Sequence, residues 1–161
     1  MKKTIGIWTL VALVGGLGCG AWGAVEAPAP ESAYASPEFL APSGDDAGVF
    51  VTCATGRKVM QVALDGTVRR EWTLESRQVK GVPVNPTGLA VAGGFVYVTC
   101  GVQAGELQKF REDGTFVASV AVGHSPCAPV VSRDGRTAYV MNRFKNAVSV
   151  VDLATMKVTG T

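Results

Sequence analysis

The chain has 161 residues, 47% hydrophobic and 17% charged, a composition typical of a packed domain and unlike that of a disordered segment. Its length favours a single domain. The net charge is +2, and without Lys2 and Lys3, which lie in a leader, the 15 basic residues become 13 and equal the 13 acidic ones. A neutral chain without a basic run lacks the electrostatic footprint of a nucleic-acid-binding protein.

Residues 1–23 have the build of a secretory signal peptide. The stretch MKKTIGIWTLVALVGGLGCGAWG has a positive start, an apolar core and small residues at its end, so we expect cleavage after Gly23. The alternatives are a retained anchor, for which the apolar core is shorter than the roughly 18 to 20 residues that span a bilayer, and a lipoprotein signal at Cys19. The expected location is the periplasm or outside the cell, assuming a bacterial source, with no membrane span after cleavage.

Residues 24–36 follow the leader and are rich in alanine and proline. This composition favours an extended linker over a packed element. The folded part of the chain is therefore expected to cover residues 37–161.

The same series of elements occurs three times in residues 37–161. Each unit has a proline-led segment, an aromatic and β-branched segment, a short polar loop, and further β-branched or aromatic segments. The proline-led segments read SPEFLAPS, NPTGLAVA and SPCAPVVS, and the second segments read VFVTC, VYVTC and AYVMN. The second segments end at corresponding positions, Cys53, Cys100 and Asn142.

Every element of the unit is predicted to be a β-strand. The runs are short, are dominated by Val, Tyr, Phe and Thr, and are interrupted by Gly, Pro and Asp, which excludes helices. The pairs Asp65-Gly66 and Asp113-Gly114 lie between apolar runs, as tight hairpin turns do. Each unit therefore holds four strands joined as antiparallel neighbours.

Four antiparallel strands repeated every 40 to 50 residues or so are the signature of a β-propeller blade. The predicted fold class is all-β, a partial β-propeller of about three four-stranded antiparallel blades. The blades are expected at about 37–80, 81–123 and 124–161, with the last truncated. A β-sandwich is the alternative, but it does not predict a repeat that keeps its register.

A propeller blade packs between two neighbours, which explains why residues 137–158 are apolar on both faces of their strands. A closed ring takes four to eight blades, and the free faces of three blades would be large apolar patches. We therefore expect further blades of the same protein beyond Thr161. Closure of a ring by several copies of the chain is the alternative.

The third unit resembles the YVTN-type β-propeller repeat of the YncE-like and lactonase-like proteins. The resemblance rests on the proline lead-in, the turn with Asp134 and Gly135, the YVMN strand from Tyr139 to Asn142, and the VSVVD strand. It covers about residues 34–161. Met156 stands where this repeat usually has glycine, and cysteine replaces the final Asn of the motif in the first two units.

Three cysteines remain after the leader: Cys53, Cys100 and Cys127. Cys53 and Cys100 occupy corresponding positions of successive blades, and stacked sheets lie about 10 Å apart, which exceeds the reach of a disulfide. We expect buried free thiols, with a disulfide as the alternative.

One rim of the propeller is expected to collect the loops after the second strands and those between blades. These loops carry the cationic candidates Arg57, His124, Arg143 and Lys145, which would favour an anionic partner. Ordinary solvated loop charge is the alternative. His124 is the single histidine, and no zinc spacing, haem motif or nucleophile elbow occurs, so no catalytic, cofactor or metal site is predicted.

These observations favour a non-catalytic, exported scaffold that binds an unidentified protein or small molecule. The alternative is an enzyme or redox protein, either a lactonase-like hydrolase or a propeller joined to a downstream cytochrome domain. A fold alone does not choose between them, because propellers carry unrelated functions.

Overall fold

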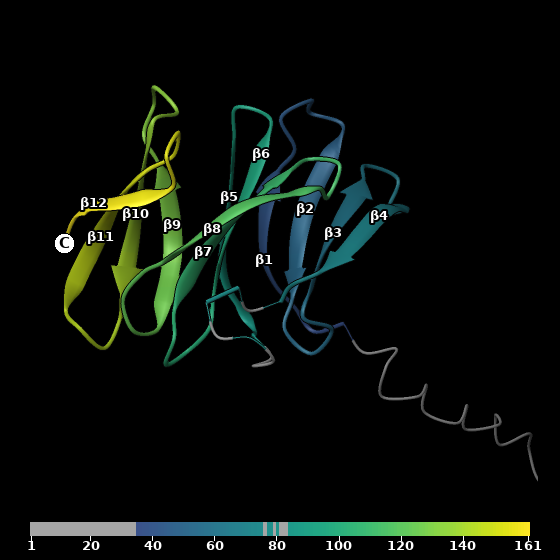
Figure 1. Cartoon of the computed structure of the whole chain (residues 1–161). Coiled ribbons are helices and arrows are strands. Elements are labelled where there is room, and N and C mark those ends of the chain that lie inside the picture. Colours follow the sequence, from purple (N-terminus) through teal and green to yellow (C-terminus); the bar gives the residue numbers. More distant parts are fainter. Residues whose placement is uncertain (1–34, 76, 79, 81–83) are drawn as a thin grey trace, which may run out of the picture.

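The computed structural model of the chain describes residues 35–75, 77, 78, 80 and 84–161, and these residues form twelve β-strands and no helix. The strands make three four-stranded antiparallel sheets that stand side by side (Figure 1). Within the described ranges, then, there is also no helix of the length and hydrophobicity that a membrane span needs. The predicted signal peptide, residues 1–23, and linker residues 24–34 lie outside the described residues.

Each sheet is one blade, and its strands pair in chain order. Blade 1 comprises β1 (Pro37–Pro42), β2 (Gly48–Cys53), β3 (Lys58–Ala63) and β4 (Val68–Thr73). Blade 2 comprises β5 (Pro86–Ala92), β6 (Phe95–Cys100), β7 (Glu106–Arg111) and β8 (Phe116–Ala121). Blade 3 comprises β9 (Pro126–Val131), β10 (Thr137–Asn142), β11 (Ala147–Asp152) and β12 (Lys157–Gly160).

The pairing registers place the repeated residues of the three blades at the same positions. The residue that ends the second strand pairs with the proline that starts the first strand in every blade: Cys53 with Pro37, Cys100 with Pro86, and Asn142 with Pro126. The repeat identified in the sequence is therefore also the structural repeat.

Aromatic side chains hold blades 1 and 2 together. The Trp72 ring of β4 lies 5.9 Å from the Phe50 ring of its own blade and 5.8 Å from the Phe110 ring of blade 2. Phe110 in turn contacts Phe116 edge to face, at 5.7 Å. Aromatic pairs at these separations add to the stabilisation that comes from buried apolar area. The interface is a continuous core and not a loose contact.

The face of blade 3 that points away from blade 2 is apolar and exposed to solvent. Tyr139 occupies the position of Phe50 and Tyr97 in blades 1 and 2, as their places in the second strands show. Phe50 is 0% exposed and Tyr97 is 2% exposed because the next blade covers them, whereas Tyr139 is 45% exposed. Met141 is 48% exposed, whereas Thr52 and Thr99, which hold the same position in blades 1 and 2, are 0% exposed. Blade 3 therefore presents a surface that its repeat buries elsewhere.

Tight Asp-Gly turns join the third and fourth strands of blades 1 and 2, as the sequence predicts. Asp65 and Asp113 each accept a hydrogen bond from the N–H two residues on, at 2.9 and 2.8 Å. Gly66 and Gly114 follow with φ of +86° and +90°, a region that strains any side chain. Hydrogen bonds from the backbone and side chain of Thr67 hold the pKa of Asp65 below its usual value, and those from the side chain and backbone of Thr115 do the same for Asp113.

The two glycines differ in their surroundings, which yields a matched pair of variants. A Cβ on Gly114 would lie 2.9 Å from the Trp72 ring, whereas one on Gly66 would meet nothing within 4 Å. Backbone strain is common to both, so Gly114→Ala should cost about 1–3 kcal/mol more than Gly66→Ala through overpacking. Urea denaturation followed by Trp72 fluorescence measures this, and equal losses would contradict the described contact between the blade 2 turn and Trp72.

Candidate functional site

One backbone hydrogen bond recurs at the same rim of all three blades. The N–H that follows each second strand donates to the carbonyl just before the proline of the first strand. The three bonds run from Ala54 to Ser36 at 2.9 Å, from Gly101 to Asn85 at 3.2 Å, and from Arg143 to Ser125 at 3.1 Å. This bond ties the loop after each second strand to the start of the innermost strand, and in blade 3 it fixes Arg143 beside Ser125.

The innermost strands are irregular where they start. Glu38 in β1 and Thr87 in β5 are the unpaired residues of β-bulges, each directly after the leading proline. In β9 the irregularity comes slightly later, and Ala128 there has a φ of +44°. A bulge takes a side chain out of the regular alternation and gives it a new direction. In β1 and β5 the residue after the proline is therefore left out of the pairing, whereas Cys127 in β9 still pairs with Met141.

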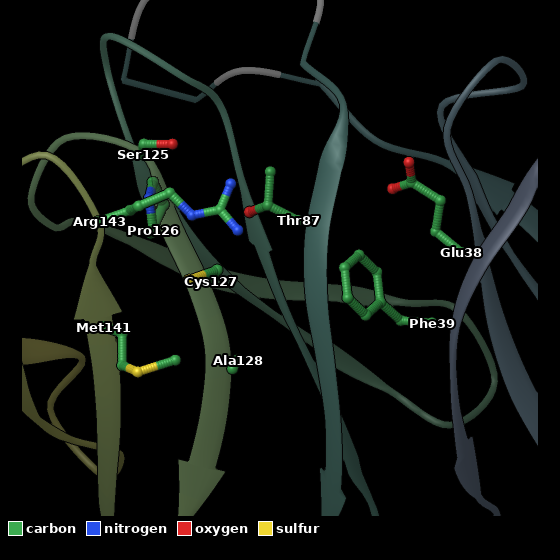
Figure 2. Close-up of a pocket in the computed structure, with 9 residues that line it drawn as sticks. All are labelled: Glu38, Phe39, Thr87, Ser125, Pro126, Cys127, Ala128, Met141 and Arg143. Atoms are coloured by element: carbon green, nitrogen blue, oxygen red, sulfur yellow. The ribbon is translucent and has the colours of Figure 1, made fainter.

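These residues line a pocket of about 470 Å³ where the three innermost strands meet (Figure 2). We call it the bore pocket. Its lining residues are Glu38 and Phe39 from β1, Thr87 from β5, Ser125, Pro126, Cys127 and Ala128 at the start of β9, and Met141 and Arg143 at the end of β10. The volume is in the range of small-molecule sites.

The polar groups of the bore pocket lie at opposite ends of an apolar floor. Figure 2 shows the Arg143 guanidinium pointing toward Thr87, with Glu38 on the far side, beyond Phe39. The Thr87 hydroxyl oxygen is buried and has no hydrogen-bond partner among the described residues. A buried hydroxyl without a hydrogen-bond partner is energetically costly. The pocket can hold an anion at one end and a donor group at the other.

Of the four predicted rim residues, the structure places one in the bore pocket and a second close to the residue that follows it in the chain. Arg143 lines the bore pocket, and the His124 ring lies 5.3 Å from the ring of Phe144, the residue after Arg143. Lys145 is exposed in the same turn and does not line the pocket. Arg57 is exposed in the corresponding turn of blade 1, where its carbonyl accepts a hydrogen bond from Leu74. The binding of an anionic partner by these residues stays a prediction.

The sequence analysis did not identify Glu38, Thr87 and Cys127 as residues of a binding site. They hold the same position of the repeat, the residue after the leading proline, and could have been found from that alignment. The signal is weak because a carboxylate, a hydroxyl and a thiol share no chemical pattern. Only the fold brings three positions about 40 to 50 residues apart in the chain to one pocket.

The three cysteines of the described residues are free thiols, and Cys53 and Cys100 are buried as expected, whereas Cys127 is not. Cys53 and Cys100 are buried, and Cys127 is partly exposed in the bore pocket. Burial raises the pKa of the Cys53 thiol, and burial together with the nearby Glu106 carboxylate raises that of Cys100. Two thiols are therefore screened from solvent and one faces a cavity.

Cys127 should react with a small alkylating reagent at least ten times faster than Cys53 and Cys100, because a thiolate in contact with solvent is the reactive species. Iodoacetamide labelling of the native protein, followed by peptide mass spectrometry, measures the three rates. Labelling after denaturation gives the control in which all three should react alike. Equal rates in the native protein would contradict the described burial.

The described part of the chain holds no cluster of three or more His, Cys, Asp and Glu side chains that could bind a metal ion. The chemistry at the bore pocket is that of one carboxylate, one guanidinium, one thiol and two hydroxyls, from Glu38, Arg143, Cys127, Thr87 and Ser125. These groups suit recognition of a polar molecule through charge and hydrogen bonds.

Solved structures place this architecture among known folds. The chain superposes on Kuenenia stuttgartiensis hydrazine synthase with a TM-score of 0.68 and 24% identity, over 85% of this chain and 38% of that one. The chain has a β-propeller fold. The Pseudomonas aeruginosa periplasmic gluconolactonase gives a TM-score of 0.63 and 24% identity, over 80% of this chain and 39% of that one. Virginiamycin B lyase from Staphylococcus aureus gives a TM-score of 0.63 and 17% identity, over 83% of this chain and 42% of that one.

The chain thus spans about two fifths of the length of these propeller structures. No protein-family description and no curated protein sequence matches it significantly. At identities below 25% the likeness concerns the fold and not the activity.

Proposed function

We propose that this chain belongs to an exported β-propeller that acts as a non-catalytic binding scaffold, with its ligand in the bore pocket. One observation carries the proposal: the residues after the three leading prolines, Glu38, Thr87 and Cys127, line the same pocket although they come from three blades. Convergence of several polar groups on one concave, partly apolar site is the usual form of a ligand site.

The ligand is inferred from the charges. An acidic group fits beside Arg143, where the Ser125 hydroxyl supplies a further hydrogen-bonding atom. Hydroxyl or amino groups fit toward the Glu38 carboxylate, because an ionised carboxylate only accepts hydrogen bonds. A polyhydroxy carboxylic acid has both features, and gluconate is a suitable test molecule because one structural neighbour is a gluconolactonase.

We also propose that the protein is exported and that its repeat is of the YVTN type. Export is supported by the build of residues 1–23, and the repeat type by the turn and strand motifs of residues 124–161. Met156 has a φ of +50°, in keeping with the glycine that usually occupies this place in the repeat.

We also propose that further blades of the same protein complete the ring. The support is the exposure of Tyr139 and Met141, whose counterparts in blades 1 and 2 are buried under the next blade. Burying a large apolar side chain contributes about 1.5–3 kcal/mol, so a cover over this face would be strongly favoured. Closure by other copies of the chain is the alternative.

Binding of gluconate, measured by calorimetry, tests the scaffold proposal. Arg143→Ala should weaken binding at least tenfold, because a charge-assisted hydrogen bond is worth about 1.5–3 kcal/mol. Lys145→Ala is the matched control, since it removes one charge two residues away without touching the pocket, and its affinity should stay within twofold.

Two results would overturn the proposal. The first is equal affinity of the Arg143→Ala variant and the unmodified protein for gluconate, which would show that gluconate does not bind in the bore pocket. The second is hydrolysis of gluconolactone that Glu38→Gln abolishes, which would make Glu38 a catalytic acid or base and favour the lactonase-like alternative.

A further inference from the structure

A second pocket lies at the opposite end of the sheets from the bore pocket, between blades 2 and 3. It has a volume of about 180 Å³ and is lined by residues of three turns and of β5, β6 and β7. They are Ala92, Gly93, Phe95, Tyr97, Lys109, Gly135, Arg136, Leu153 and Ala154. We call it the interblade pocket. Its polar side chains are basic or phenolic, and none of its lining residues is acidic.

Lys109 is the central charged group of this pocket. Its side chain is almost wholly covered, with 9% of the residue exposed. The ammonium donates one hydrogen bond to the Leu153 carbonyl at 2.8 Å and lies 4.1 Å from the centre of the Phe95 ring. It forms no salt bridge with any acidic side chain that the structure describes. A buried cation of this kind is costly unless an opposite charge compensates it.

Only blade 2 of the three described blades has a positively charged residue at this position of the repeat. Lys109 pairs with Tyr97 across the sheet, and the residues in the same place are Gln61, which pairs with Phe50, and Val150, which pairs with Tyr139. Gln61 is as deeply buried as Lys109, at 5% exposure. An uncharged side chain therefore serves the packing role, and the ammonium needs another explanation.

Two further cations lie in or close to the interblade pocket. Arg136 lines the pocket from the turn between β9 and β10, and the Arg111 guanidinium lies 5.9 Å from the centre of the Phe95 ring. Burial, and then the charge of Arg111, lowers the pKa of Lys109. Asp134, in the same turn as Arg136, accepts hydrogen bonds from the Ser132 hydroxyl at 2.6 Å and the Arg136 N–H at 3.1 Å. Among the described residues neither Lys109 nor Arg136 forms a salt bridge, so the interblade pocket presents two cations and no carboxylate in its lining.

We infer that the interblade pocket binds a small tetrahedral oxyanion, a phosphate or the phosphate group of a small ester. Lys109 and Arg136 reach the pocket from two different blades, so an anion between them would be contacted from more than one direction. Arginine and lysine are the usual protein partners of phosphate. By joining blade 2 to blade 3, the anion would also stabilise their interface.

Calorimetric titration of the full chain with inorganic phosphate, at constant ionic strength set with chloride, tests this inference. Saturable binding is expected, and Arg136→Gln and Lys109→Gln should each weaken it at least tenfold. Lys109→Gln introduces the residue that blade 1 carries at this position. Arg133→Gln is the matched control, because it removes a positive charge from the same turn outside the pocket, and its affinity should stay within twofold.

Absence of saturable phosphate binding would overturn the inference, as would equal binding by the Arg136→Gln, Arg133→Gln and unmodified proteins. Arg136 is exposed, so its variant decides the question even where Lys109→Gln fails to fold. Tighter binding of glycerol 2-phosphate than of inorganic phosphate would identify an ester as the source of the anion, and the reverse order would identify free phosphate. Equal affinity for acetate would contradict a site for a tetrahedral oxyanion.

Discussion

The whole structure depends on the need of each blade for a cover on both faces. A blade is one antiparallel sheet, and its strands carry apolar side chains on both sides, so a single neighbour leaves half of them in water. Blade 2 meets this need: Val96, Val98 and Phe110 are buried against blade 1, and Tyr97 and Leu107 against blade 3. Blade 3 has one cover, and the identity of its second cover is the main question that the fold poses.

The same stacking creates the two pockets. Each innermost strand starts with proline and is irregular near its start, so polar side chains of three blades can face one shared cavity. At the other end, turns of neighbouring blades meet and bring Lys109 and Arg136 to one pocket. Neither pocket belongs to one blade. Both arise where repeated elements are brought together, and their chemistry varies with the residues that each blade supplies.

The strands could be predicted from the sequence because their signals are local and repeated. Short β-branched runs, Asp-Gly turns and leading prolines recur in register, and the equivalence of Cys53, Cys100 and Asn142 followed directly. The free state of Cys53 and Cys100 could be predicted for the same reason, since equivalent positions of stacked sheets lie too far apart for a disulfide.

The sites were harder to predict because their residues are far apart in the chain. Arg143 was selected for its charge in a rim loop, but Glu38 and Thr87 become candidates only when β-bulges redirect them. Lys109 lies in LQKFRED, which looks like an ordinary strand with a solvated lysine. Its burial depends on the packing of blade 3 over blade 2, which strand patterns alone do not describe.

The central claim is that the outer face of blade 3 is built to be covered by another blade. Hydroxyl-radical footprinting of the mature protein purified from its own source tests it through two equivalent tyrosines. If another blade covers this face, Tyr139 should be oxidised as slowly as Tyr97 in the mature protein. Tyr139 should become reactive in the 161-residue chain produced alone as a monomer. Rapid oxidation of Tyr139 in the mature protein, at a rate near that of the exposed Phe144, would contradict the claim.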